Sequence, residues 1–201
     1  MEPATRTNRN ARSALALLLV AVAFCVTTES GASAASGPRL TVNPVDPGDS
    51  TLLSWAVDRF DLAGLQLPEL IVTFHEDTAG CNGSAGLYRH GTPGHVHICV
   101  SADRPALTRK LITLHELGHA WAENPINEAT RVAFLEERGV DTWHHPDQAP
   151  HLWGAEHAAE TISWALMDEP VQIIRIYDAA PEQLSSAFRL LTGCSPLNPS
   201  V

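Results

Sequence analysis

Basic residues are scarce in this sequence. It contains 13 Lys and Arg side chains against 23 Asp and Glu, so its formal charge is −10, and Lys110 is its only lysine. No basic stripe or cluster occurs along the chain, which argues against nucleic acids and anionic membrane surfaces as partners. Of its 201 residues, 44% are hydrophobic and 18% are charged, values typical of one soluble domain with a buried core.

Long apolar runs are absent except near the N-terminus. Three arginines precede an apolar run over residues 13–26, and small residues at 32–34 follow it. A bilayer span takes about 20 apolar residues, so this pattern predicts a secretory signal peptide over 1–34, with an uncleaved signal anchor as the alternative. A linker is then expected at 35–50 and a single domain at 51–201 of a secreted or extracytoplasmic protein.

Cysteines are few, and none has the C-x-x-C spacing of a cysteine zinc site. Removal of the signal peptide leaves Cys81, Cys99 and Cys194. Export to an oxidising compartment favours a disulfide. We predict that Cys81 pairs with Cys99, because both flank a Gly-rich turn between two runs that could lie side by side. Cys194 is then left out of the pairing.

The hydrophobic pattern predicts an α+β domain. Period-2 and β-branched runs indicate strands, and apolar residues at helical spacing indicate helices. The strands are expected at 70–74 and 95–100, and the helices at 52–65, 105–122, 127–138, 155–167 and 181–191. A short apolar run covers 171–176.

The strongest chemical signal is an H-E-x-x-H motif within the predicted 105–122 helix. His115 and His119 are four residues apart and therefore lie on one helical face, where both imidazoles can reach one ion. Neutral imidazole suits Zn²⁺, and a catalytic zinc keeps an open position for water. Glu116 lies beside the two ligands and is predicted to be the general base for that water. Two surface histidines without a metal are the alternative.

Gly118 within the motif favours a packed helix over an exposed one. A glycine inside a helix costs about 1 kcal/mol relative to alanine. Such a residue usually marks a close approach of another element, and we expect that element to be the sheet.

A third ligand must come from elsewhere in the chain. Ala122 and Pro125 stand where the metzincin pattern requires glycine and histidine, which excludes that class. Glu156 and Glu160 lie four residues apart on the apolar 155–167 helix and share a face. We predict that Glu156 binds the metal and that Glu160 orients a ligating histidine through a hydrogen bond; the reverse assignment is the alternative.

These motifs resemble those of a known family. The string Leu114–Ala120, followed by Glu156 and Ala159 in the form E-x-x-A, is similar to gluzincin-type zinc metallopeptidases, in particular small bacterial ImmA/IrrE-like enzymes and exported actinobacterial relatives. Glu160 stands where that family often has asparagine. The resemblance covers residues 70–168 and implies a zincin-like fold, with a small sheet packed on the motif helix, and peptidase activity on a peptide or protein substrate.

The sequence leaves open the oxyanion donor, the strand that binds substrate and the reaction class. His144, His145 and Tyr88 are candidates for stabilising an oxyanion, and their spacing singles out none of them. The 95–100 strand is expected to be an exposed sheet edge that binds extended peptides, with 70–74 as the alternative. The alternatives to a peptidase are a zinc amidohydrolase or esterase and a non-catalytic, zinc-stabilised binding module.

Overall fold

A computed structural model of the protein describes residues 40–198 except 125, 146, 174 and 178. The predicted signal peptide lies outside these residues. Within them, no helix combines the length and the apolarity needed to cross a membrane.

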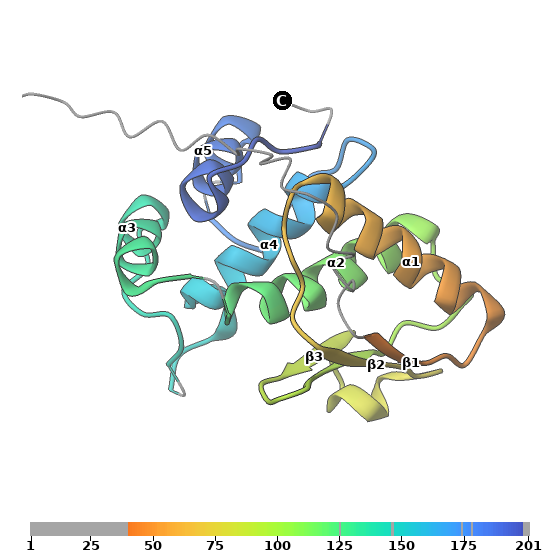
Figure 1. Cartoon of the computed structure of the whole chain (residues 1–201). Coiled ribbons are helices and arrows are strands. Elements are labelled where there is room, and N and C mark those ends of the chain that lie inside the picture. Colours follow the sequence, from red (N-terminus) through yellow and green to blue (C-terminus); the bar gives the residue numbers. More distant parts are fainter. Residues whose placement is uncertain (1–39, 125, 146, 174, 178, 199–201) are drawn as a thin grey trace, which may run out of the picture.

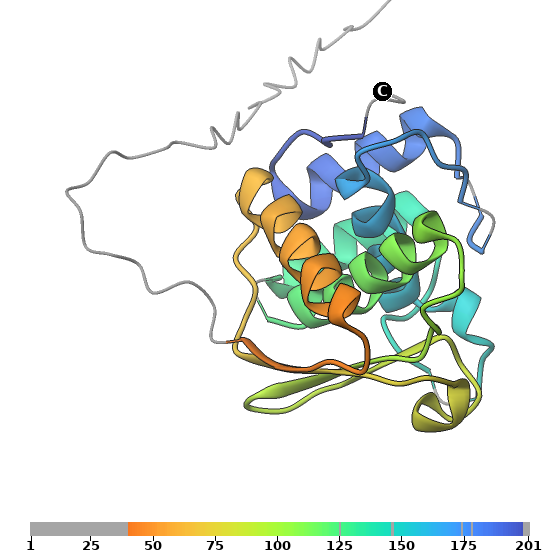
Figure 2. The ribbon, with the colours of Figure 1, turned by 90° about the vertical axis from the view of Figure 1, so that its right-hand side faces the viewer.

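The domain is α+β, with a small mixed sheet below a group of helices (Figure 1). The turned view shows the α-helices on one side of the sheet (Figure 2). The elements follow the order β1 (Leu40–Asn43), α1 (Pro47–Leu62), β2 (Leu70–Phe74), the 3₁₀ turn η1 (Thr78–Cys81), β3 (Gly86–Arg89), β4 (Gly94–Ile98), α2 (Ala106–Ala122), α3 (Glu128–Arg138), η2 (Pro150–Leu152), α4 (Gly154–Leu166) and α5 (Pro181–Thr192).

The five helices confirm the predicted ones to within a few residues. α1 begins earlier than expected, because Asp46 accepts a hydrogen bond from the backbone of Gly48 and Pro47 occupies the first turn. α3 ends at Gly139, which adopts a left-handed conformation with φ of 63°. The apolar run at 171–176 forms neither a helix nor a strand in its described residues.

The sheet has the strand order β1-β2-β4-β3. β1, β2 and β4 run parallel, and β3 pairs antiparallel with β4. Neither β1 nor β3 was predicted. β1 alternates apolar and polar side chains but has only four residues, and β3 is equally short and shows little alternation. β1 and the first turn of α1 lie in the 35–50 segment that was expected to be a linker, so this part of it belongs to the domain.

The position of β4 corrects one functional prediction. β4 is paired on both sides, with β2 and with β3, so its backbone groups are not available to a peptide. The prediction of a free edge at 95–100 is therefore wrong, and so is the alternative at 70–74, because β2 lies between β1 and β4. β3 is the edge strand on this side. Pairing order depends on contacts distant in sequence, which a local pattern does not reveal.

The core lies between the sheet and the helices and continues between the helices themselves. On β2, Leu70, Val72 and Phe74 are buried while the residues between them are half-buried. α2 and α4 form the centre of the helical part (Figure 1). Their fully buried residues include Leu114, Leu117, Ile162 and Trp164.

Gly118 allows α2 to approach α4 closely. A Cβ added at Gly118 would lie 3.2 Å from the Cα of Ala159 and 3.3 Å from its carbonyl oxygen. The prediction of close packing at Gly118 is therefore confirmed, but its partner is a helix and not the sheet. This contact aligns the helix that carries His115 and His119 with the helix that carries Glu156.

The predicted disulfide between Cys81 and Cys99 is present. It joins η1 to the residue that follows β4, and the backbone N–H of Cys99 donates to the carbonyl of Ala85, directly before β3. Cys194 takes no part in it. A disulfide is compatible with an extracytoplasmic location.

Candidate metal centre and cleft

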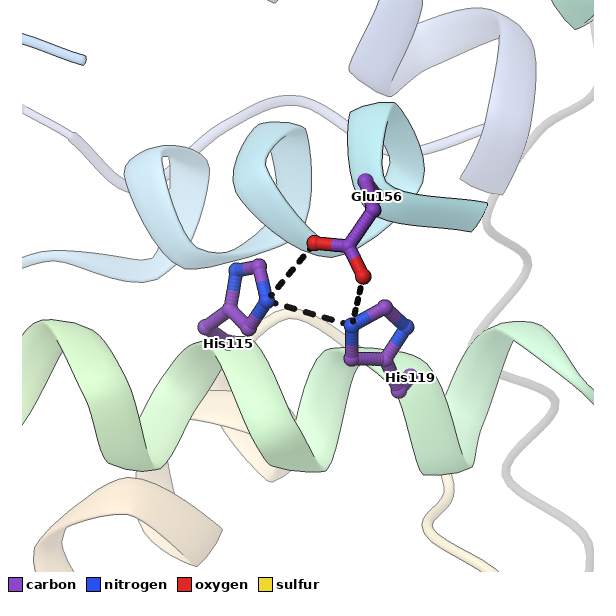
Figure 3. Close-up of side chains that lie close together, drawn as sticks. All are labelled: His115, His119 and Glu156. Carbon is purple, nitrogen blue, oxygen red and sulfur yellow. Dashed lines mark hydrogen bonds and ion pairs between the residues drawn. The ribbon is translucent and has the colours of Figure 1, made fainter. Parts of the chain in front are cut away.

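His115, His119 and Glu156 converge on one point (Figure 3). The Nε2 atoms of the two histidines are 3.1 Å apart. The two carboxylate oxygens of Glu156 each lie 3.4 Å from one of these nitrogens, Oε2 from His115 and Oε1 from His119. This group could hold a metal ion, and it contains the three side chains that the sequence predicted as ligands.

Two helices position this group. His115 and His119 lie one turn apart on the same face of α2, and Glu156 extends from the first turn of α4 (Figure 3). His115 is 6% exposed, whereas the Glu156 side chain is 26% exposed. The group is therefore enclosed on the α2 side and open toward solvent beyond Glu156.

Glu160 lies behind His115. Its Oε1 is 3.4 Å from Nδ1 of His115, and the residue is only 5% exposed. This distance is long for a hydrogen bond, and Nδ1 has no partner with good hydrogen-bond geometry. The carboxylate nevertheless faces the ring nitrogen opposite the converging Nε2, which is the position expected of a group that orients His115.

His115 and Glu156 strongly influence each other's pKa. Burial lowers the pKa of His115, but the hydrogen bond to Glu156 and the charges of Glu116 and Glu160 outweigh it and raise the pKa to about 9. Burial raises the pKa of Glu156, but hydrogen bonds from His115 and His119 hold it well below its usual range. Without a metal, these side chains form an ion pair, so a cation that binds here must displace a proton from His115.

Glu116 lies beside the convergent group and faces the sheet. It is 6% exposed, and its carboxylate lies so close to Gly86 of β3 that a Cβ at that position would come within 2.3 Å of Oε1. Burial raises the pKa of Glu116, while the nearby His115 and His119 oppose this shift. Gly86 therefore leaves the space in which the Glu116 carboxylate lies.

A cleft of about 690 Å³ runs past these residues. Its walls include His115, Glu116, His119 and Glu156, residues 84–88 of β3 and the turn before it, and side chains from the loops that follow α3 and α4. Of the three oxyanion candidates, Tyr88 and His144 line the cleft and His145 does not. The cleft thus places an edge strand opposite the helix that carries the H-E-x-x-H motif.

The exposed edge of β3 faces away from β4. Cys99 donates to Ala85, so the pair of residues 85 and 99 is hydrogen-bonded, and such pairs alternate with non-hydrogen-bonded ones along an antiparallel ladder. Gly86 and Tyr88 therefore direct their N–H and C=O groups outward. Among the described residues, no further strand pairs with them.

Three cleft residues were missed by the sequence analysis. Gly86 gave no local signal, because its role depends on its contact with Glu116. Glu123 lies four residues after His119, on the same helical face, and that spacing was a usable signal. Arg175 interrupts the apolar 171–176 run; it lines the cleft, and its Nη1 is 3.6 Å from Oε1 of Glu160.

Comparison with known proteins adds no family assignment. The chain matches no protein-family model, and no curated protein matches it. The interpretation of the site therefore depends on its own geometry.

Proposed function

We propose that this protein is an exported zinc-dependent metallopeptidase of the gluzincin type, with His115, His119 and Glu156 as zinc ligands and Glu116 as general base. The convergence of the three ligand side chains carries this proposal. Ligand atoms about 2.0–2.1 Å from a tetrahedral zinc are about 3.3 Å from one another. The two Nε2 atoms are 3.1 Å apart, each Glu156 oxygen lies 3.4 Å from one of them, and with one ligand atom taken from each residue all three lie within 4.8 Å of one another. Three protein ligands leave one position open.

The donor set supports zinc over the harder divalent cations. Two imidazoles with one carboxylate are typical of catalytic zinc, whereas calcium and magnesium prefer oxygen ligands in larger number. When bound, zinc lowers the pKa of a water toward about 7 and polarises the scissile carbonyl.

The chain's own residues supply the remaining steps. Glu116 accepts the proton of the attacking water and delivers it to the leaving nitrogen, while Glu160 holds the ring of His115 in place. Of the candidates that line the cleft, Tyr88 is the donor available to the developing oxyanion, because Nε2 of His144 already lies 2.9 Å from Oε1 of Glu123. An extended peptide lies along β3 and pairs with the outward backbone groups of Gly86 and Tyr88.

Metal analysis tests the ligand set. We expect one zinc per chain in the wild type, loss of zinc in Glu156→Ala, and retention in Glu160→Ala, since Glu160 only orients a ligand. Zinc loss from Glu160→Ala together with retention in Glu156→Ala would reverse the assignment of the two carboxylates.

Glu116→Gln tests the reaction. The amide is nearly isosteric but cannot accept a proton, so zinc content should be unchanged while cleavage of a mixture of unstructured peptides falls by about 10²–10⁴-fold. Mass spectrometry of the peptide mixture measures this directly. If wild-type protein binds zinc and cleaves no peptide, the alternatives of an amidohydrolase or esterase and of a zinc-stabilised binding module take precedence.

A further inference from the structure

The cleft continues past the convergent group along α2 and reaches Glu123, the residue that follows the last turn of the helix. Glu123 takes no part in the proposed chemistry. Its side chain is 19% exposed, so it is largely enclosed but open to the cleft. His144 lies against Glu123, and the aromatic side chains of Tyr88 and Trp153 line the same cleft.

Within the described residues, only one of the two carboxylate oxygens of Glu123 accepts hydrogen bonds. Trp143 Nε1 donates to Oε1 at 3.0 Å, and His144 Nε2 lies 2.9 Å from the same oxygen. In the described part of the chain, Oε2 has no hydrogen-bond partner. Oε2 is not among the buried atoms that lack a partner, so an external cation or hydrogen-bond donor can reach it from the cleft.

The charge of this carboxylate is retained at neutral pH. Burial raises the pKa of Glu123, but the hydrogen bonds from His144 and Trp143 outweigh it and lower the pKa below its usual range. The positive charge of Arg131 also lowers this pKa, and Arg131 does not line the cleft. Among the described residues, the guanidinium that lines the cleft is that of Arg175, which lies 3.6 Å from Glu160.

We propose that Glu123, with the aromatic rings of Tyr88 and Trp153, forms a subsite for a cationic group of the substrate. An ammonium or guanidinium would donate to Oε2, and its aliphatic stem or planar group would pack against the rings. This inference rests on the proposed peptidase function and specifies its substrates as peptides that carry a positive charge near the cleaved bond. The charge belongs to a lysine or arginine side chain or to a free amino terminus.

The distance along α2 sets the position of that charge in the substrate. Glu123 lies four residues beyond His119, which corresponds to about 6 Å along a helix. An extended peptide advances about 3.3 Å per residue. The cation is therefore expected about two residues from the cleaved bond.

The subsite can be tested by mapping cleavage sites in a diverse peptide mixture. We expect wild-type protein to prefer lysine or arginine over norleucine at one position by about 10-fold, the effect of one hydrogen bond to a charged group. Glu123→Gln still accepts from Trp143 and His144 but carries no charge, so it should lose the preference. Glu123→Lys should prefer glutamate there, and Glu137→Gln, an exposed change on α3, should leave the preference unaltered. Acetylated and free amino termini distinguish the two sources of the cation.

Binding measurements separate this inference from the peptidase proposal. In a Glu116→Gln background, a lysine peptide should bind about 10-fold more tightly than its norleucine counterpart, and the additional change Glu123→Gln should abolish that difference. Such binding without any wild-type cleavage would leave the subsite intact and overturn the peptidase. Cleavage with no charge preference, or a preference that survives Glu123→Gln, would overturn the subsite.

Discussion

The two walls of the cleft are built in different ways. The helical wall, α2 and α4, brings backbone against backbone, with Gly118 directly beside Ala159. The strand wall is the four-residue edge strand β3, held by its pairing with β4 and by the nearby Cys81–Cys99 disulfide. Here the close contact of Gly86 is with the flexible Glu116 side chain, from Cγ to the carboxylate.

Because the two walls are held in different ways, metal binding and the action of Glu116 should respond to different substitutions. The positions of the convergent side chains depend on how two helices pack, so a disturbance there should affect folding and metal binding together. The position of Glu116 depends on the space that β3 leaves open, so a disturbance there should affect turnover alone. The two glycines offer the most direct way to test this separation.

The largest effect is expected for Gly118→Val. The added side chain would meet the backbone of Ala159, which cannot move without shifting α4. Overpacking typically costs about 1–3 kcal/mol, and separating α2 from α4 would also separate the ligands. We expect a lower denaturant midpoint and loss of bound zinc. In Gly118→Ala, the gain in helix propensity of about 1 kcal/mol should offset only part of the strain. A zinc-loaded Gly118→Val protein of wild-type stability would refute this account of the helical wall.

Gly86→Ala should alter the strand wall and leave the helical wall unchanged. A Cβ at this position would occupy the space of the Glu116 side chain from Cγ to the carboxylate, and a flexible side chain can turn away more easily than a helix backbone can move. Zinc content and the denaturation midpoint should stay close to wild type, while kcat falls toward that of Glu116→Gln, by about 10²-fold or more. Unchanged kcat would mean that Glu116 works from another position.

Removal of the disulfide tests how much the covalent link between Cys81 and Cys99 contributes to the stability of the strand wall. Replacing Cys81 and Cys99 together by serine opens a loop with a sequence separation of 18 residues. Such a cross-link contributes about 3 kcal/mol in the chain-entropy model. We expect the free energy of unfolding to fall by that amount in urea titrations, with zinc still bound because α2 and α4 are unaltered. Loss of zinc in this variant would show that the two walls are not independent.

The smallest effect concerns an ion pair between Lys110 on α2 and Asp168, which follows α4. Burial raises the pKa of Asp168, but hydrogen bonds from Lys110 and Trp55 outweigh it and hold the pKa below the usual range of aspartate. A lowered pKa stabilises the fold above the unfolded value, about 3.9, and this contribution disappears as the pH falls through the folded value. Asp168→Asn should therefore be less stable than wild type by less than about 1 kcal/mol at pH 7. The two proteins should converge at acidic pH; a constant difference would point to a loss of packing instead.

Local sequence determined much of the framework. The helix positions follow from apolar periodicity with capping residues and left-handed glycines, which act within one or two turns. The four-residue spacing of His115 and His119 places both imidazoles on one face of any helix that contains them. The Cys81–Cys99 pairing was accessible for a similar reason, since a short loop with a Gly-rich turn brings its ends together at small entropic cost.

Only the tertiary structure decided the features that depend on distant pairings. The order of the strands made β3, and not the 95–100 strand, the edge beside the H-E-x-x-H helix. Gly118 signalled a close contact, but its partner became visible only with α4 in place. Glu156 and Glu160 are equivalent in a helical repeat, and the packing of α4 against α2 brings Glu156 into the convergent group and leaves Glu160 behind His115. Spacing along the sequence determines which side chains share one face of a helix or strand. Which of two equivalent side chains enters the site is determined by the element that packs against that face.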